Sequence, residues 1–425
     1  MNMEHNQNWR DIRASLSSVD KLWMAALAVT VAYIVLITGD AYVAGIPFKL
    51  GLVGLTLVIW AFSRPTWNEP GRFPLKWTVL TLAVAIPLIW ALVAFAHGSI
   101  LGGDSPDSQF VAQHASRFGY LLLYFPFCDL ARRFGDRSLW LIMVPILGLC
   151  AVTVGIWGWH LATGNQFGTS EVLVFKGVIG AGSEGFRVFI GNQVMFILAV
   201  SIVLSRVSVK GPGRLDVAIF FALFVCTWLS HTRGIWLGLA AACITIVFGC
   251  LYIGSSRRVR RALGTIAAGG AVIIAVLGIL VVAGNELGGL VSDESTNTRV
   301  RQAPKLLDEF RENPVLGKGL GTTLDDFKRS RANPWSFELT YLQILFQMGV
   351  IGLLAMAATI GSAIWRGAVD YVRSAGDSWM PLAGVATLIG MLVASATNPY
   401  LFSAFGMLMT AVAMMMLRPP SRTER

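Results

Sequence analysis

Apolar runs recur from one end of this chain to the other, and they constrain the fold more than any other feature. Crossing a hydrocarbon core of about 30 Å takes about 20 helical residues, and many of the runs reach that length. The chain is 55% hydrophobic and only 14% charged, whereas soluble domains carry about 25% charged residues. The first run follows a polar segment that lacks a small-residue cleavage pattern, so we interpret it as a retained span. The sequence predicts an all-α integral membrane protein.

The apolar runs accommodate about twelve transmembrane helices. The predicted spans lie near residues 21–39, 46–63, 77–97, 117–131, 139–162, 187–205, 215–231, 234–254, 263–284, 338–364, 380–397 and 399–417. The connections between them alternate between a basic set and a set whose short members, such as 39–47 and 99–115, lack Lys and Arg. Because Lys and Arg accumulate in cytoplasmic loops, both termini are predicted to be cytoplasmic. Residues 1–425 then form a single polytopic membrane domain, with 285–336 as a large outer loop between spans nine and ten.

Charge and cysteine content exclude several classes of function. The net charge of +10 comes from short loops between apolar runs, and not from an aromatic-interleaved basic patch, so a nucleic-acid partner is not expected. The five cysteines lie in apolar runs without CxxC spacing, which is typical of small buried hydrophobic residues. The predicted outer face carries no H-E-x-x-H, DxD or metal-spaced acidic pair, so no metal or other cofactor is expected.

The large outer loop has its own helical pattern. Residues 298–313 place Ala303, Leu306, Leu307 and Phe310 at i, i+3, i+4 and i+7, which predicts an amphipathic helix along the membrane surface. A glycine-rich turn, 315–321, follows. Its spacing is a weak match to a nucleotide-binding loop, because no strand precedes it and it faces outward.

Five ionisable residues from four parts of the sequence fall on the predicted outer face. They are Arg187, Arg233, Arg299, Arg301 and Glu338. Arginine at a span end commonly snorkels to lipid headgroups, but short outer connections are poor in arginine. Since guanidinium groups bind phosphate oxygens bidentately, this group suits a lipid-linked diphosphate.

Glu338 opens a predicted span, where a carboxylate is costly unless it is paired or used. It is either a salt-bridge partner of one of the arginines or a general base toward a sugar hydroxyl. His231, beside Arg233, and Tyr341, on the helix that follows Glu338, are possible accessory residues. His97 and His114 flank an outer loop and carry no motif.

These residues resemble the bacterial O-antigen ligase and O-antigen polymerase superfamily. Its signature, a histidine, ten residues, a glycine and then G-x-x-G, is similar to the segment from Glu338 to Gly349 and Gly352. The segment 233–237 is similar to its R-x-x-x-L element, and 299–321 to its outer loop. The resemblance covers roughly residues 185–355.

The resemblance implies a GT-C-type glycosyltransferase of the bacterial inner membrane with a periplasmic active site. Such an enzyme takes glycan from undecaprenyl diphosphate, without a metal, while arginines hold the diphosphate. In a ligase of lipopolysaccharide biosynthesis the acceptor is lipid A–core, and in a polymerase it is another lipid-linked repeat unit. By this resemblance Arg187, Arg233, Arg299 and Arg301 would bind the diphosphate, and Glu338 and Arg233 would be catalytic.

The sequence departs from the family at the position of the base. The family's histidine aligns with Glu338, and the asparagine that usually follows aligns with Leu339. Three alternatives follow: Glu338 is the base, His231 is the base, or stabilisation of the diphosphate leaving group carries most of the rate.

A transporter of lipid-linked or anionic solutes is the alternative from another functional class. It would place charges near the bilayer midplane and show repeat symmetry between two halves of the chain. The centres of the predicted spans hold almost no charged residues, which favours the enzyme.

Overall fold

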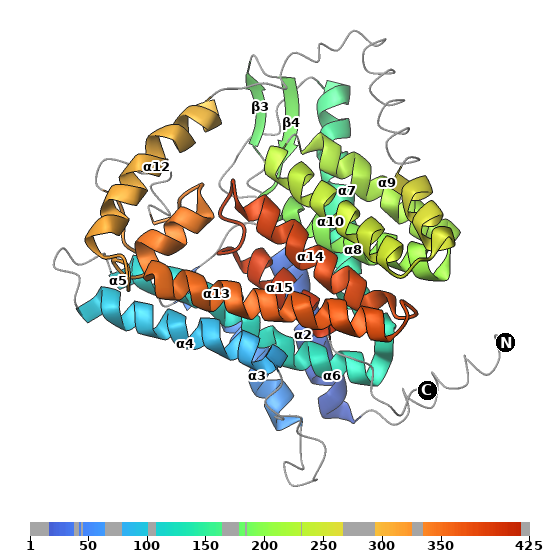
Figure 1. Cartoon of the computed structure of the whole chain (residues 1–425), viewed down its shortest axis with the longest axis horizontal. Helices are drawn as coiled ribbons and strands as arrows, with labels where there is room; N and C mark the ends of the chain where they lie inside the picture. Colours follow the sequence, from blue (N-terminus) through green and yellow to red (C-terminus); the bar gives the residue numbers. More distant parts are fainter. Residues whose placement is uncertain are drawn as a thin grey trace.

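A computed structural model describes ten stretches of the 425 residues. They are residues 17–37, 42–43, 46–63, 79–100, 108–163, 178–182, 185–230, 232–266, 294–324 and 335–417. Most of the elements are helices, and the chain also contains two short antiparallel hairpins, β1–β2 and β3–β4. The chain is therefore a helical protein with small β elements that the sequence did not predict (Figure 1).

The elements follow one another along the chain with these bounds. The N-terminal half contains α2 (Ser18–Leu36), β1 (Tyr42–Val43), β2 (Ile46–Pro47), α3 (Phe48–Phe62), α4 (Val79–Ile100), α5 (Ser108–Phe118), η1 (Gly119–Leu123), α6 (Tyr124–Phe134), η2 (Gly135–Leu139), α7 (Trp140–Thr163), β3 (Val178–Gly182), β4 (Gly185–Phe189) and η3 (Gly191–Val194). The C-terminal half contains α8 (Met195–Lys210), α9 (Arg214–Leu229), α10 (Arg233–Tyr252), a helix over 256–266, α12 (Glu294–Glu312), α13 (Thr340–Arg373), α14 (Trp379–Ser395) and α15 (Ala404–Met416).

Helices of membrane-spanning length account for a large part of this architecture. Among the described residues, five helical stretches are long and apolar enough to cross a membrane: Ser18–Leu36, Gln113–Trp159, Gly191–Lys210, Arg233–Tyr252 and Thr340–Arg373. Four shorter apolar helices accompany them: Phe48–Phe62, Val84–His97, Trp379–Ser395 and Ala404–Met416. These stretches confirm the prediction of a helical membrane protein, whereas the number twelve stays a prediction. The predicted span 263–284 lies outside the described residues beyond position 266.

Two predicted spans differ from the observed elements. The span predicted at 117–131 is divided among the end of α5, the 3-10 turn η1 and α6. The span predicted to open at residue 187 begins instead with β4, and its α-helix starts at Met195. The segment pairs with β3 as an antiparallel hairpin, and its Phe186, Val188 and Phe189 are residue types that favour a strand.

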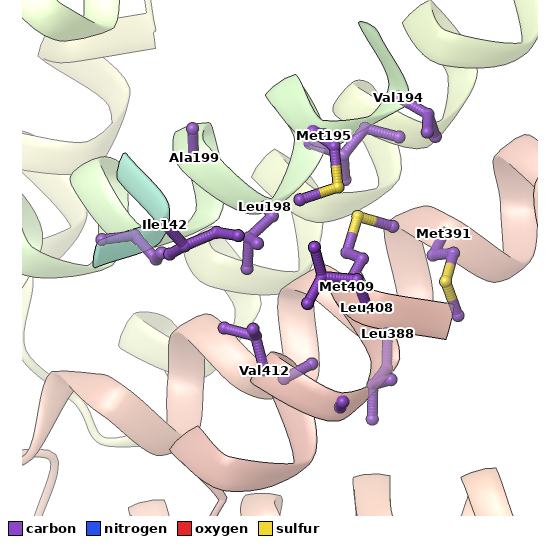
Figure 2. Close-up of a cluster of buried hydrophobic side chains, with 14 of the residues drawn as sticks. Ile142, Val194, Met195, Leu198, Ala199, Leu388, Met391, Leu408, Met409 and Val412 are labelled. Atoms are coloured by element: carbon purple, nitrogen blue, oxygen red, sulfur yellow. The ribbon is translucent and has the colours of Figure 1, made fainter. Parts of the chain in front are cut away.

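The main core lies where α8 packs against α14 and α15. Figure 2 shows the apolar side chains that meet there, among them Met195 and Leu198 of α8, Met391 of α14 and Met409 of α15. Unbranched, polarisable methionines fill irregular gaps between helices, and buried helices without internal space resist rearrangement. These three helices form the main packed core among the described residues.

Two glycines allow α10 to approach α14 closely. A side chain at Gly238 would meet the Gly390 carbonyl oxygen at 2.5 Å, and one at Gly390 would meet that of Gly238 at 2.6 Å. Small residues at helix contacts permit close backbone packing in membranes, where van der Waals contact drives association. This contact fixes the position of α10 and hence of its first residue, Arg233.

Candidate functional site

The candidate site is formed where α12 meets the start of α13 (Figure 1). Glu338 stands just before α13 and is 9% exposed. The Arg299 side chain of α12 forms an ion pair with it, with 2.9 Å between Arg299 Nε and Glu338 Oε2. The structure therefore joins two of the five outer residues that the sequence singled out, although they are 39 positions apart.

Gln302 of α12 also contacts Glu338. Its side-chain oxygen accepts a hydrogen bond from the Glu338 backbone N–H at 3.0 Å, and the residue is fully buried. Gln302 lies three positions after Arg299, so both side chains project from one face of the helix. Glu338 is thus held through its carboxylate by Arg299 and through its backbone by Gln302.

A small second core docks α12 onto α13. It consists of Leu306, Leu324, Phe337 and Phe346, all buried, with the Phe337 and Phe346 rings edge to face at 5.8 Å. The predicted amphipathic helix is confirmed, because α12 spans Glu294–Glu312. On its apolar face Leu306 is buried and Leu307 is 37% exposed, and the position of the helix along a membrane surface stays a prediction.

Two glutamines of α13 bind the segment that leads into the helix. Gln343 accepts from the Phe337 N–H at 3.2 Å and donates to the Trp335 carbonyl at 3.1 Å. Gln347 donates to the same carbonyl at 3.1 Å and to the Thr322 carbonyl at 2.9 Å. The two side chains also bond each other at 3.1 Å. This buried network fixes residues 335–338, and with them the backbone of Glu338.

The glycine-rich turn is inserted into a break in α13. Gly349 has φ 67° and ψ −175° in the middle of the helix, a conformation that glycine adopts at little cost. At the break the N–H groups of Lys318 and Gly319 bond the carbonyls of Phe346 and Gln347, at 2.8 and 3.0 Å. Beyond it, the N–H groups of Val350 and Ile351 bond the carbonyls of Pro314 and Val315, at 2.9 and 3.3 Å.

This insertion, here called the α13 break (residues 314–319 with 346–351), satisfies the backbone groups that a helix interruption exposes. The contact is so close that a side chain at Gly349 would meet the Val315 oxygen at 2.2 Å, and one at Gly317 would meet the Gly349 nitrogen at 2.6 Å. The motif glycine eleven positions after Glu338 therefore has a physical role: it lets the outer turn cross the helix.

Ion pairs between Lys318 and α12 stabilise the α13 break. The Lys318 ammonium group forms ion pairs with Glu309 and with Glu312, the latter at 2.6 Å. Partial burial by itself lowers the pKa of Lys318, but the two carboxylates outweigh it and hold that pKa above its usual value. The turn is thus fastened both to the α13 backbone and to the last turns of α12.

The start of α10, where Arg233 lies, packs against the connection between α14 and α15. Arg233 is the first residue of α10, and a side chain at the adjacent Gly234 would meet Asn398 Nδ2 at 2.6 Å. The Thr340 hydroxyl donates to the Asn398 carbonyl at 2.8 Å. The first turns of α10 and α13 therefore flank the same short connection. Arg233 itself is exposed.

The remaining predicted site residues lie in different surroundings. Arg187 is in β4, paired with Gly180 of β3, and β4 packs on α7 and α9. Arg301 is exposed on α12. Tyr341 donates from its hydroxyl to the Leu392 carbonyl at 2.6 Å, which ties α13 to α14. His231 lies outside the described residues.

Several residues of the site carried no signal in the sequence. Gln302, Gln343 and Gln347 are unremarkable as letters, and only their burial in an apolar surrounding marks them. His114 is fully buried and stacks on Trp335, with ring centroids 4.4 Å apart. For glutamines in α13, their position on the buried face of a predicted span was the one available clue.

Metal-ligand side chains are not grouped in the part of the chain that the structure describes, where no three His, Cys, Asp or Glu residues come together. The five cysteines are buried, as predicted.

Comparison with protein families agrees with the geometry. Residues 218–357 match the model of the O-antigen ligase family. The matched segment runs from α9 to just beyond Gly349, so it contains Arg233, Arg299, Glu338 and the α13 break. No curated protein matches the chain.

The match supports the resemblance of these motifs to the O-antigen ligase-like superfamily over residues 218–357. Together with the apolar helices, this match indicates a multi-pass membrane protein with a segment similar to the O-antigen ligase family.

Proposed function

We propose that this protein is an O-antigen ligase, a GT-C-type membrane enzyme that moves glycan from undecaprenyl diphosphate to lipid A–core on the periplasmic face of the inner membrane. The observation that carries the proposal is the partly buried Arg299–Glu338 ion pair at the start of α13, inside the segment that matches the family model. A carboxylate and a guanidinium at one corner suit a reaction in which a hydroxyl attacks and a diphosphate departs.

In the proposed reaction the acceptor hydroxyl loses its proton to the Glu338 carboxylate as its oxygen attacks the anomeric carbon. The bond between that carbon and the diphosphate oxygen breaks, and undecaprenyl diphosphate leaves with the bonding electron pair. Arg233, Arg299, Arg301 and Arg187 would bind the diphosphate oxygens, and Arg233 supports this role because a helix N-terminus also favours anions. No metal or cofactor is required in this scheme, and His231 and Tyr341 would be accessory.

Transfer by purified protein tests the base assignment. With undecaprenyl-linked glycan as donor and lipid A–core as acceptor, we expect Glu338→Gln and Glu338→Ala to lower kcat about 100-fold or more. Glu338→His restores the family residue and should retain more activity than either. Asp308→Asn, an exposed change on the adjacent helix, is the matched control. Near-normal turnover of Glu338→Gln would remove Glu338 as the base and favour leaving-group stabilisation.

The same assay distinguishes a ligase from a repeat-unit polymerase, which uses the same donor. A ligase transfers glycan to lipid A–core, whereas a polymerase extends a second lipid-linked repeat unit. Extension of the lipid-linked repeat without transfer to lipid A–core would replace the ligase with the polymerase.

Arg233→Lys tests the diphosphate site, because it keeps the charge but loses the guanidinium fork. We expect an increase in donor KM or a loss of turnover of about tenfold or more. Arg214→Lys, at the exposed start of α9, is the control. Full activity of Arg233→Lys would exclude Arg233 from diphosphate binding.

A further inference from the structure

Gln302 has a buried NH₂ group that donates no hydrogen bond to the described residues. Its oxygen faces the Glu338 N–H, which is a donor, so the orientation of the carboxamide is fixed and its NH₂ group points elsewhere. Nε2 is buried and has no hydrogen-bond partner among the residues that the structure describes, and the whole side chain is fully buried.

A buried donor without an acceptor costs free energy, and folded proteins rarely keep one without a reason. The neighbouring buried position on this face of α12, Leu306, is apolar and packs in the small second core. A glutamine at 302 is needed to hold the Glu338 backbone, but holding it requires only the side-chain oxygen. The NH₂ group is therefore available for a ligand that brings an acceptor to the Glu338 corner.

The position of this donor restricts the ligand. Nε2 belongs to the group that contacts the Glu338 backbone, and Arg299, one turn earlier on α12, contacts the Glu338 carboxylate. Gln302 and Glu338 therefore place an amide donor and a carboxylate acceptor at the same junction of α12 and α13. A hydroxyl satisfies both, because it has one proton to donate and two lone pairs to accept.

We propose that Gln302 is a substrate-binding residue, whose NH₂ group donates to the oxygen of the acceptor saccharide's reacting hydroxyl while Glu338 accepts that hydroxyl's proton. This inference rests on the proposed function. One lone pair of the hydroxyl oxygen accepts from Gln302 and the other attacks the anomeric carbon, so two-point binding orients the nucleophile before transfer. Gln302 thereby recognises a hydroxyl on the acceptor, and the arginines recognise the donor.

The test is a comparison of acceptors in the wild-type protein and Gln302→Met, a change of similar length that removes the amide. A set of single-deoxy lipid A–core saccharides identifies the reacting hydroxyl as the one whose loss abolishes transfer. Inhibition constants of this deoxy saccharide and of the intact one then measure the contribution of the hydroxyl to binding. We expect Gln302→Met to raise the acceptor KM about tenfold and to reduce the preference for the intact saccharide at least threefold.

Gln343→Met is the structural control, because the oxygen and nitrogen of Gln343 both have protein partners. It should lower the melting temperature without changing the preference for the intact saccharide. A purely structural role of Gln302 would weaken both saccharides alike, and an unchanged preference in Gln302→Met would overturn the inference.

The donor provides the remaining outcome. A fall in affinity for undecaprenyl diphosphate with an unchanged acceptor KM would assign the Gln302 amide to a diphosphate oxygen and overturn the acceptor assignment. Absence of any transfer by the wild-type protein would overturn the proposed function and this inference with it. Transfer by the wild-type protein with an unaltered preference in the variant would overturn the inference alone.

Discussion

The main core of α8, α14 and α15 and the junction of α12 with α13 use buried polar groups in opposite ways. In the core, Ser201 and Ser208 of α8 donate to carbonyls of their own helix, Ile197 and Leu204, each at 2.7 Å. At the junction, Gln347 and the N–H of Lys318 bind groups far away in the sequence. These α8 hydroxyls therefore form hydrogen bonds within their own helix, which is held to its neighbours by apolar packing. The junction instead depends on hydrogen bonds between segments that are distant in the sequence.

This difference predicts how each region responds to change. Loss of a packing contact leaves a core helix intact and lowers the free energy of unfolding in proportion to the cavity that it creates. Loss of one contact at the junction leaves a buried backbone group without its hydrogen-bond partner. The region that holds Glu338 should therefore be the more brittle of the two.

The largest effect is expected for Gly349→Ala. Position 349 has a positive φ, which alanine adopts only with strain, and the added methyl group would lie 2.2 Å from the Val315 oxygen. The glycine-rich turn must therefore leave the α13 break. We expect glycan transfer to fall at least 100-fold, because displacement of the turn moves residues 335–338. Gly361→Ala lies in the same helix, with nothing within 4 Å of the added methyl group, and should transfer normally. Equal activity of the two variants, measured at matched expression, would break the comparison.

A smaller effect is expected for Gln347→Leu. It removes hydrogen bonds to the Thr322 and Trp335 carbonyls and should lower the free energy of unfolding by about 2 kcal/mol. Ser201→Ala removes a buried hydroxyl that bonds its own helix and should change it by less than about 0.5 kcal/mol. Unfolding in detergent measures both, and a larger loss for Ser201→Ala would reverse the assignment of the brittle region.

Leu198→Ala tests whether a loss of packing in the main core affects stability without affecting turnover. Leu198 is fully buried against α14 and α15 (Figure 2), and its truncation should cost about 2 kcal/mol through the cavity it leaves. Turnover per folded molecule should stay within about twofold of the wild type, because α8 carries none of the α12–α13 contacts. A fall in kcat with unchanged melting temperature would show that the core and the junction are coupled.

The smallest effect is expected at alkaline pH. Since Glu309 and Glu312 raise the pKa of Lys318 above its usual 10.5, the protonated form is the one that stabilises the fold. Its contribution is fully present below pH 10.5 and is lost as the pH rises through the higher folded value. Lys318 is 24% exposed, so the contribution should be about 1 kcal/mol or less.

Hydrogen exchange at Lys318 and Gly319 measures this contribution. Their N–H groups bond α13 across the break, so their protection should fall between pH 10 and 12 in the wild type. In Lys318→Met it should be lower throughout, with no added fall from this group. Lys210→Met breaks an exposed ion pair with Asp136 and should leave the exchange unchanged. An identical pH profile in Lys318→Met would exclude Lys318 as the titrating group.

Much of this fold follows from local patterns. The predicted helix at 298–313 corresponds to α12, and the spans predicted at 215–231 and 234–254 correspond to α9 and α10 within a few residues. These predictions succeed because periodicity and apolar length act within one segment. Arg187 shows where they fail: the pattern of its segment predicts the start of a span, but pairing with β3 makes it a strand.

The sequence by itself determined that this chain forms apolar helices in a membrane, because a bilayer core offers backbone groups no other partners. It also determined the spacing from Glu338 to Gly349 that marks the family. Only the tertiary structure decided that the turn at 314–319 enters α13 at Gly349, that Arg299 pairs with Glu338, and that Gln302 keeps a buried donor beside it. These contacts join residues 28 to 39 positions apart, and such pairings are selected by the packing of whole helices and not by any local pattern of residues.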